Sequence, residues 1–519
     1  MEQLLLQSLE MESLAPALPA DIANALAETV IGPLAEINVY PRSITAANHC
    51  LYFLGRRDTQ KYAGIISTEA HRAGVLLGTP RSVRLKDTAL HLALAEADTQ
   101  TSGVFQEALS FLKPQVIGSA LSAGCGDRLG LATPGHIQAV RKAGVAPILA
   151  QQSVRENERT GRTPADVMAD AVWGVFETGW RDGFGADADH LKTPEALAPF
   201  VDAGYTFFTI DPGDHVDARA DTAATADLEA LVEALPWNAL ESRAADLKRA
   251  LCRQPLDLDG HPCPLTEAQV HRAAAKYGRV VAHTVGMYRH LKDRLANRPF
   301  ELEVSVDETD TVTSLAEHIY IATELKRLGV NWISLAPRYV GDFEKGVDYI
   351  GDLATFENSF AQHAAVARTL GPYKLSLHSG SDKFRIYPIA ARHTRGLVHL
   401  KTAGTSYLEA LRATAMTDPD LFRQIMALAV ERYPVDRASY HVSARIDKLP
   451  PFRQIPDDTL PELLEDFHAR EILHVTYGSV LNHPTLRSAF FAVLKTNVSL
   501  YTTLIAKHFD RHLQPFRRL

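Results

Sequence analysis

Three Thr-Pro pairs, at positions 133, 163 and 193, recur at intervals of 30 residues, which is the length of one strand-helix unit of a parallel sheet. Such a pair is typical of a helix start, because the threonine hydroxyl caps free backbone N–H groups and proline has no N–H that needs a partner. The repeat therefore predicts three consecutive helices, each at the same point of a strand-helix unit.

Short runs of apolar or small residues precede these helices, and similar runs follow them along the chain. The eight candidate strands span residues 115–121, 146–152, 185–191, 205–211, 300–306, 331–336, 373–378 and 397–401. Helical patterns fill the intervals, and a helix C-cap is expected at Gly144, Gly204, Gly329 and Gly371. This alternation predicts an α/β protein with a (β/α)8 TIM-type barrel, and the alternative is a doubly wound open sheet.

The 519-residue chain is much longer than the ~250 residues that a barrel needs. We expect an N-terminal extension over residues 1–110, a catalytic barrel over 111–416 and a C-terminal helical extension over 417–519. Residues 212–299 lie between the fourth and fifth strands and carry amphipathic patterns, which predict a helical insertion that could serve as a lid or an interface. Both terminal extensions are expected to be helical.

The charge balance narrows the partners of this chain. A net charge of -8 and a pI of about 6.2 disfavour nucleic acid and anionic membranes, because both are held by basic surfaces. We expect a small-molecule partner, and a homo-oligomer stays open. The N-terminal segment lacks a basic stretch and a cleavage site, so we expect a cytoplasmic protein. The four cysteines are too few and too irregularly spaced for a disulfide framework or a thiolate zinc site.

Polar residues gather where the predicted strands end, which is the edge that forms the active site of a barrel. In chain order they are Asp127, Arg128, Gln151, Gln152, Asp189, His190, Asp211, Asp307, Arg338, His378, Lys401 and Thr402. The predicted strand starts are mostly apolar or small, so we expect a polar cluster at one end of the barrel. Strand ends also border solvent, however, where polar residues are common in any protein.

His190 and His378 are the best candidates for metal ligands, because imidazoles and carboxylates from separate strands hold catalytic divalent ions. The alternative for either histidine alone is a hydrogen-bonded residue near the core. Asp189 and His190 are adjacent and cannot both face the interior of a regular strand, so their joint use requires a turn or a bulge.

The fifth strand carries Glu303, Ser305 and Asp307 on one face, because side chains alternate with a period of two. If Asp307 faces the barrel mouth, then Glu303 lies in the interior, where a carboxylate must be paired, hydrogen-bonded or bound to metal. Glu303 is therefore either catalytic or part of a structural ion pair. Glu301 is expected to face solvent near the strand start.

Several residues near these strand ends suit a polyhydroxylated substrate. Arg338 could form a fork to a carboxylate or to hydroxyls, and residues 379–383 offer hydroxyls, backbone N–H groups and a charge pair, although they could simply form a loop and a helix cap. The candidate substrate-binding residues are Asp127, Arg128, Gln152, Arg338, Ser379, Asp382, Lys383 and Lys401. The sequence has no dinucleotide fingerprint or phosphate loop, so no nucleotide cofactor is expected.

Several long motifs lie at or near the predicted strand ends and in the C-terminal segment. They are SAGCGDRLGLATPGH (122–136), GADADHLKT (185–193), SLAPRYVGDFEKGVDY (334–349), KLSLHSGSDKF (374–384), LVHLKTAGTSYLEALR (397–412), HVTYGSVL (474–481) and HFDRHLQPF (508–516). Together these motifs resemble the tagaturonate epimerase family. The resemblance runs from about residue 110 to the C-terminus. It implies an isomerase, a carbohydrate epimerase that interconverts tagaturonate and fructuronate with a divalent metal cation, and related enzymes act on tagatose and fructose.

The resemblance also implies roles for individual residues. Asp189 would be the catalytic base, His190 and His378 would bind the metal, and Glu303 would be the acid partner. The choice of Asp307 as a third metal ligand comes from strand geometry and not from a family motif.

The chemistry of such substrates indicates a route. The inverted carbon bears a hydroxyl β to the ketone, so we expect retro-aldol cleavage and readdition with Mn, Co, Ni or Zn as the cation. Lys401 could instead form an imine, which the metal candidates make the second choice. A metal-dependent sugar aldolase or isomerase and a non-catalytic sugar-binding barrel stay open as alternatives. A uronate and a neutral ketohexose are both compatible with the sequence.

Overall fold

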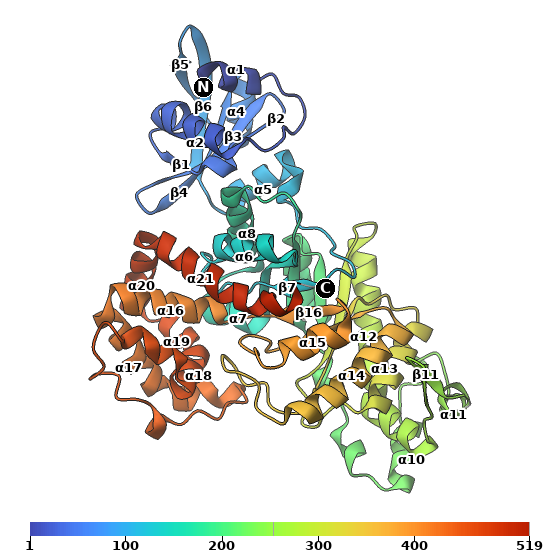
Figure 1. Cartoon of the computed structure of the whole chain (residues 1–519). Coiled ribbons are helices and arrows are strands. Elements are labelled where there is room, and N and C mark those ends of the chain that lie inside the picture. The colour runs from blue at the N-terminus through green and yellow to red at the C-terminus, as the bar shows by residue number, and fades with distance from the viewer. Residues whose placement is uncertain (253, 518–519) are drawn as a thin grey trace.

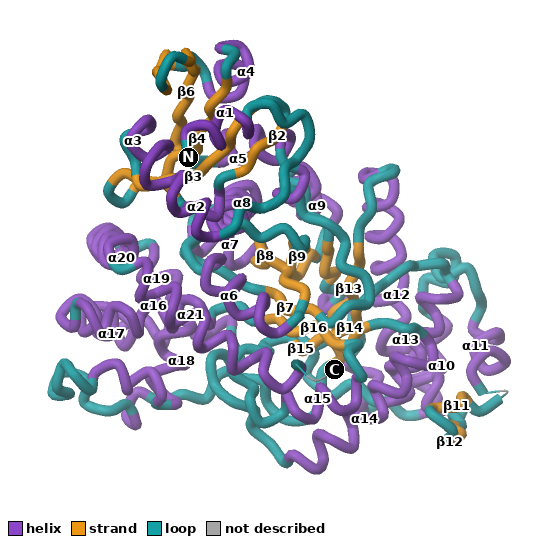
Figure 2. The backbone as a smooth tube through the Cα atoms, turned by 45° about the horizontal axis from the view of Figure 1, so that its top comes forward, coloured by secondary structure: helices purple, strands orange, loops and turns teal. Residues whose placement is uncertain are grey.

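The computed structural model describes residues 1–252 and 254–517, and a closed barrel of eight parallel strands forms its centre (Figure 1 and Figure 2). The strands are β7 (Ser122–Gly124), β8 (Ala146–Ser153), β9 (Gly185–Leu191), β10 (Phe207–Ile210), β13 (Glu301–Val306), β14 (Ser334–Pro337), β15 (Lys374–Leu377) and β16 (Val398–Lys401). β16 pairs with β7 and closes the cylinder. This confirms the predicted (β/α)8 barrel and excludes the open sheet, which would have two free edges.

Helices surround the barrel strands, as Figure 2 shows. They are α6 (Thr133–Ala143), α7 (Val154–Thr160), α8 (Pro164–Thr178), α9 (Pro194–Asp202), α13 (Leu315–Arg327), α14 (Leu353–Leu370), α15 (Tyr387–Thr394) and α16 (Thr405–Thr417). Thr163 and Thr193 cap α8 and α9 through their side chains, as the Thr-Pro repeat predicts. Thr133 is not a cap, because α6 already begins at Thr133 and not at the following proline. Ala132 is therefore at the N-cap, and its N–H donates to the Asp127 carboxylate.

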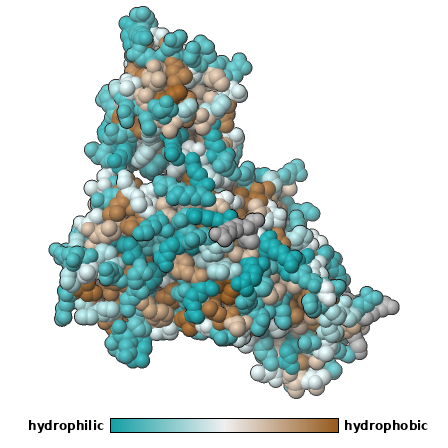
Figure 3. Space-filling view, in the orientation of Figure 1, coloured by the Kyte–Doolittle hydropathy of each residue, from teal (hydrophilic) through white to brown (hydrophobic). Residues whose placement is uncertain are grey.

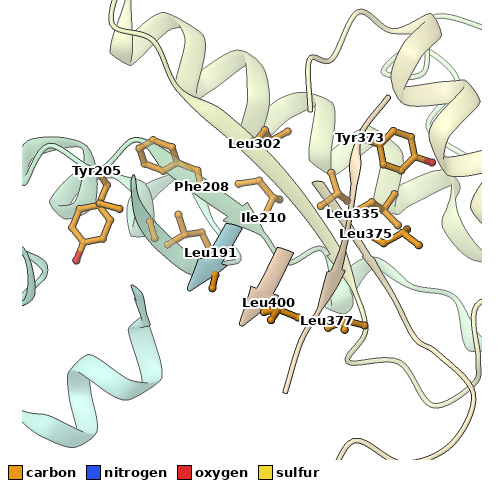
Figure 4. Packing of buried hydrophobic residues seen from close by; sticks show 14 of the residues in the cluster. Leu191, Tyr205, Phe208, Ile210, Leu302, Leu335, Tyr373, Leu375, Leu377 and Leu400 are labelled. Atoms are coloured by element: carbon orange, nitrogen blue, oxygen red, sulfur yellow. The ribbon is translucent and has the colours of Figure 1, made fainter. Parts of the chain in front are cut away.

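The barrel strands place apolar side chains toward the helices and polar side chains inside. Leu302, Leu335 and Leu375 belong to the buried apolar packing in Figure 4. Alternate strand positions carry the buried polar residues Asp187, Glu303, Lys374, His399 and Lys401. Glu301 does not face solvent as expected, because it shares the inner face with Glu303, and its buried carboxylate accepts the N–H of Gly118.

The prediction of the first strand over residues 115–121 is wrong, because β7 covers Ser122–Gly124. The glycines here allow close approach of neighbouring strands. A Cβ added to Gly124 would lie 3.0 Å from the Gln151 side chain, and one added to Gly126 would lie 2.8 Å from the Ala403 backbone. A strand built from such small residues resembles a loop in sequence, so it gave no apolar pattern to detect.

The N-terminal extension is not mainly helical as predicted, because it is built on an antiparallel sheet in the order β1-β3-β4-β6-β5, with β2 paired to β3. Its strands are β1 (Asn38–Val39), β2 (Thr45–Ala47), β3 (Cys50–Arg57), β4 (Gln60–Ser67), β5 (Arg81–Leu85) and β6 (Thr88–Glu96). Its helices are α1 (Glu2–Ser8), α2 (Ala20–Leu26), α3 (Gly32–Ala35), α4 (Ala70–Leu77) and α5 (Thr99–Ala108). The hairpin of β3 and β4 turns at Asp58, whose φ of 54° is typical of a tight turn. This lobe is blue at the top of Figure 1.

The insertion and the C-terminal segment are mainly helical. Residues 212–299 form α10 (Thr225–Glu233), α11 (Ala244–Leu251), the hairpin of β11 (Leu256–Leu258) and β12 (His261–Cys263), and the long α12 (Glu267–Leu295), which packs against α13. The last segment forms α17 (Pro419–Asp436), α18 (Phe467–Val475), α19 (Tyr477–Leu481), α20 (Pro484–Thr496) and α21 (Val498–Leu513). α21 packs against α6 and α16, so the C-terminal segment returns to the barrel.

Among the residues that the structure describes, buried apolar side chains form three clusters, one of which surrounds the barrel. The face in Figure 3 shows hydrophobic residues in small groups among hydrophilic ones. Within residues 1–252 and 254–517, no single helix has both the length and the hydropathy of a membrane span, although the bent pair Pro484–Thr496 and Val498–Phe516 meets that test jointly by length and composition.

Candidate active site

A bulge in β9 brings Asp189 and His190 to one side of the barrel mouth. The three-residue step from Ala188 to Leu191 pairs with a two-residue step in β10, so one residue of β9 is extra. Within this bulge His190 has a left-handed backbone conformation, with a φ of 53°. The extra residue breaks the usual alternation of faces. Both side chains therefore line the same cavity.

His190, Asp307 and His378 come from three strand ends and could together hold a metal ion. One ligand atom of each lies within 4.8 Å of the other two. Further carboxylates contact both rings, because His190 Nδ1 lies 3.3 Å from Asp211 Oδ2 and His378 Nε2 lies 2.6 Å from Glu303 Oε1. In metal centres such carboxylates fix the orientation of the histidine rings.

The charge around the two histidines suits a divalent cation. Burial disfavours the charged form of His190, yet Asp189 and the hydrogen bond with Asp211 raise its pKa to about 10. For His378, burial is outweighed mainly by Asp307, and the pKa rises to about 9. The ring centroids are only 5.0 Å apart, so two imidazolium charges would repel each other. One divalent cation bound to two neutral imidazoles would neutralise the same carboxylates without that repulsion.

Lys401 lies in the barrel interior beside the histidines. Its Nζ atom lies 2.9 Å from Asp187 Oδ2, 2.5 Å from Asp189 Oδ1 and 2.9 Å from Glu303 Oε1. Burial disfavours the ammonium form, but these carboxylates raise the pKa of Lys401 well above its usual value. Burial also opposes ionisation of Asp189 and Glu303, yet Lys401 lowers the pKa of both. Lys401 therefore keeps both carboxylates ionised.

A cavity that opens to solvent lies above these residues. It is lined by the predicted site residues Arg128, Asp189, His190, Asp307, His378, Ser379 and Lys401 and also by Gln151, Ser153, Arg155, Glu156, Lys345, Ala403, Tyr440 and His474. Tyr440 and His474 come from the C-terminal segment, which strand counting does not connect with the barrel mouth. One sequence feature could have indicated Lys345 and His474 as site residues, because each lies within a motif that resembles the family.

Three predicted substrate-binding residues lie outside this lining and have structural contacts instead. The Asp127 carboxylate accepts three backbone N–H groups of the loop that follows it, at 2.7 to 3.0 Å. Gln152 Oε1 accepts from Arg162 at 3.2 Å. The Arg338 guanidinium faces Asp342, with Nη2 3.7 Å from Oδ1. All three side chains thus have partners within the protein, Gln152 from within β8, and their role in substrate binding stays a prediction.

Asp382, Lys383 and Glu303 also lie outside the lining. Asp382 is buried against the C-terminal segment, and the Lys383 ammonium donates to backbone carbonyls, including that of Glu344 at 2.8 Å. Glu303 is fully buried beneath His378, between this ring and Lys401. Its position suits an orienting residue better than an acid that must reach a ligand.

Besides Lys401, three cationic side chains line the cavity. Arg128 is committed to the wall, because its Nε donates to Glu156 at 2.9 Å and it is almost fully buried. Arg155 has its nearest ion-pair partner at 3.6 Å, and the Lys345 ammonium donates only to the Ser379 hydroxyl among its described partners, at 2.7 Å. Arg155 and Lys345 are therefore available to an anionic ligand.

Fold and site together define a (β/α)8-barrel enzyme whose strand-end acids and histidines surround a pocket for a polar ligand. A model of the UxaE family, described as tagaturonate epimerase, matches residues 40–516. The chain belongs to the tagaturonate epimerase family, and it is an isomerase of the carbohydrate epimerase class. The match starts well before residue 110, so it also covers most of the N-terminal sheet.

Individual relatives cover nearly the whole chain. The tagaturonate/fructuronate epimerase of Thermotoga maritima is 41% identical over 475 residues, which are 92% of this chain and 96% of that protein. The crystal structure of fructuronate-tagaturonate epimerase UxaE from Cohnella laeviribosi is 33% identical with a TM-score of 0.86, and the match covers 94% of this chain and 99% of that one. These comparisons confirm the family that the sequence motifs indicate.

Proposed function

We propose that this chain interconverts tagaturonate and fructuronate, with a divalent cation held by His190, Asp307 and His378. The substrate pair comes from the names of the relatives. The donor set carries the metal proposal, because two imidazoles and a carboxylate with ligand atoms within 4.8 Å are typical of catalytic centres with open positions. Mn, Co, Ni or Zn would suit these donors. A bound cation would supply Lewis acidity toward the substrate ketone.

A uronate suits the cavity better than a neutral ketohexose. Arg155 and Lys345 line the wall and have room for an additional anionic partner. A carboxylate on the substrate would pair with both cations, whereas a neutral sugar would bring no negative charge to them. In this proposal Arg155 and Lys345 bind the carboxylate, because Arg338 faces Asp342 and the Lys383 ammonium donates to backbone carbonyls.

Asp189 is the base in this proposal, because it lines the cavity in ionised form. It removes the proton of the hydroxyl on the inverted carbon, and the bond between that carbon and its ketone-side neighbour breaks. The electron pair stays on the ketone half as an enediolate, and the other half becomes an aldehyde. After the aldehyde turns, the bond forms again on its other face and Asp189 returns the proton.

Lys401 and Glu303 support this step without leaving their positions. The Lys401 ammonium stays 2.5 Å from Asp189 and keeps it ionised between turnovers. Glu303 holds the Nε2 side of His378, so that the Nδ1 side faces Asp307 at 3.1 Å. Cytoplasmic location and assembly into a homo-oligomer stay predictions from the sequence.

Metal content and turnover of ligand variants test the proposal. We would compare the wild type, His378→Asn and Asp307→Asn, with His393→Asn on the outer helix α15 as the matched control. Metal would be measured by mass spectrometry, and conversion of tagaturonate by NMR. Wild type and control should bind metal and form fructuronate, and the two site variants should lose both. Three-carbon fragments without an epimer would show an aldolase, and site variants that keep metal and turnover would overturn the metal site.

A further inference from the structure

We infer that the C-terminal segment positions the active-site loop after β15, and that Asp382 is the residue through which it acts. The inference builds on the proposed function, because His378 and Ser379 at the start of this loop belong to the proposed site. Asp382 is thus a positioning residue and not a contact for substrate.

The loop from His378 to Lys383 has a backbone shape that needs external support. Ser379 and Asp382 both have positive φ angles, of 48° and 62°. Residues other than glycine adopt this region at a cost, and they hold it only where surrounding contacts fix it. The loop is therefore sensitive to the contacts made by its far end.

Asp382 makes these contacts with two helices of the C-terminal segment. Its Oδ1 lies 2.5 Å from His508 Nε2 on α21, and its Oδ2 lies 2.9 Å from Arg470 Nη2 on α18. Its backbone N–H donates to His512 Nε2 at 2.9 Å. All of these side chains are at most 8% exposed, so water weakens the interactions little. Side chain and backbone of one loop residue are both held.

The cluster has the contacts of a structural brace and not of a second metal centre, although Asp382, His508 and His512 lie close enough together to bind an ion. His512 Nε2 already accepts the Asp382 N–H, and its Nδ1 lies 3.1 Å from the carbonyl of His508. The Arg470 guanidinium supplies the positive charge that an ion would bring. His508 lies between two carboxylates, because its Nδ1 is 3.4 Å from Glu409 Oε1.

The loop transmits this support to the cavity. The Gly380 N–H donates to the carbonyl of Lys401 at 3.0 Å, and the Ser379 hydroxyl accepts from Lys345. His378 directly precedes these residues. If Asp382 loses its partners, the left-handed residues can relax, and His378 and Ser379 then leave their positions. Loss of such supporting partners typically costs about 10- to 100-fold in activity or metal affinity.

Asp382→Asn and His508→Leu test the inference, and His508→Gln serves as the conservative variant that keeps a donor near Asp382. The matched control is Asp436→Asn, because Asp436 lies in the same segment but pairs with Arg432 and Ser479. We would measure kcat and KM for tagaturonate, the thermal midpoint, and hydrogen exchange of the peptide that covers residues 378–386.

We expect Asp382→Asn and His508→Leu to lower kcat about 10- to 100-fold, with a smaller change in KM, and to accelerate exchange in this peptide. His508→Gln should recover part of kcat. Exchange and kcat equal to those of Asp436→Asn would overturn the inference. A lower thermal midpoint with unchanged exchange in the peptide would also overturn the inference, because it would show that Asp382 and His508 stabilise the fold without positioning the loop. The exchange measurement needs no turnover, so a wild type that fails to convert tagaturonate would contradict only the proposed function.

Discussion

The Nζ atom of Lys401 lies 2.5 Å from Oδ1 of Asp189 in the interior of the barrel. The two residues belong to β16 and β9, which are separated in the sheet by β7 and β8, so their contact crosses the interior. Lysine and aspartate therefore act as one charged unit. This pairing favours a carboxylate base over an amine nucleophile, because each partner stabilises the ionised form of the other.

Lys401→Met should destabilise the protein and abolish most turnover. The substitution leaves three buried carboxylates without their cation, and breaking buried pairs of this kind costs about 3–5 kcal/mol. We expect a corresponding loss in the free energy of unfolding in urea and a fall in kcat of about 100-fold or more. Lys326→Met, on the exposed side of α13, is the control. If Lys401→Met equals Lys326→Met in both unfolding free energy and kcat, Lys401 supports neither stability nor turnover.

Borohydride should not trap an intermediate on Lys401. The pKa of this amine is held well above its usual value, so the neutral form that attacks a ketone is scarce. We expect tagaturonate and borohydride together to leave the peptide that contains Lys401 without added mass. A reduced adduct at Lys401, formed equally well in the presence of a chelator, would show an imine route instead.

Lys345→Met should impair turnover of the uronate more than turnover of the neutral sugar. If Lys345 and Arg155 read the substrate carboxylate, loss of one cation should raise KM for tagaturonate about tenfold and leave the kcat/KM for tagatose within about threefold. Arg155→Met should behave alike. Steady-state kinetics with both substrates would check this. Equal losses of kcat/KM for the two substrates would mean that these residues shape the cavity and do not bind the substrate carboxylate.

Glu471→Gln should make the protein more stable at high pH. Burial and the neighbouring Glu344 raise the pKa of Glu471 to about 9 from a usual value of 4.5, so the folded protein holds a proton that the unfolded chain loses above pH 4.5. Stability supplied by this proton is present at low pH and is lost as the pH rises toward 9. Glutamine mimics the protonated form and removes this loss.

Urea unfolding at pH 5.5 and pH 8.5 measures this effect. The gain in unfolding free energy of Glu471→Gln should be about 1–3 kcal/mol larger at the higher pH. Glu431→Gln, on an exposed position of α17, should give the same difference from wild type at both values. A gain for Glu471→Gln that does not depend on pH would mean that Glu471 is ionised in the folded protein throughout this range.

The barrel was predictable because its signals are local. Strand-helix alternation, the caps at Thr163 and Thr193, and acids at strand ends depend on short stretches of sequence. The sequence showed only that Asp189 and His190 need a bulge or a turn to face the same cavity. It did not show that the bulge exists, because a bulge reverses the face of a side chain without a recognisable sequence pattern. β7 escaped detection because three small residues have no apolar period.

The cavity wall could not be predicted, because it depends on packing between distant segments. Tyr440 and His474 reach the mouth only because the C-terminal helices fold back onto the barrel. Asp382 and Lys383 follow a strand end and carry suitable groups, yet the same returning segment and a neighbouring loop occupy them. A position directly after a strand identifies a residue as a candidate for the site. Whether its side chain faces a ligand depends on its contacts with distant parts of the chain.

Turnover of tagaturonate before and after chelation, with tagatose in parallel, tests metal-dependent epimerisation most directly. We expect conversion to fructuronate that a chelator abolishes and that added Mn, Co, Ni or Zn restores, with tagatose converted less efficiently. Conversion that is unchanged after complete removal of metal, shown by mass spectrometry of the protein, would contradict this expectation.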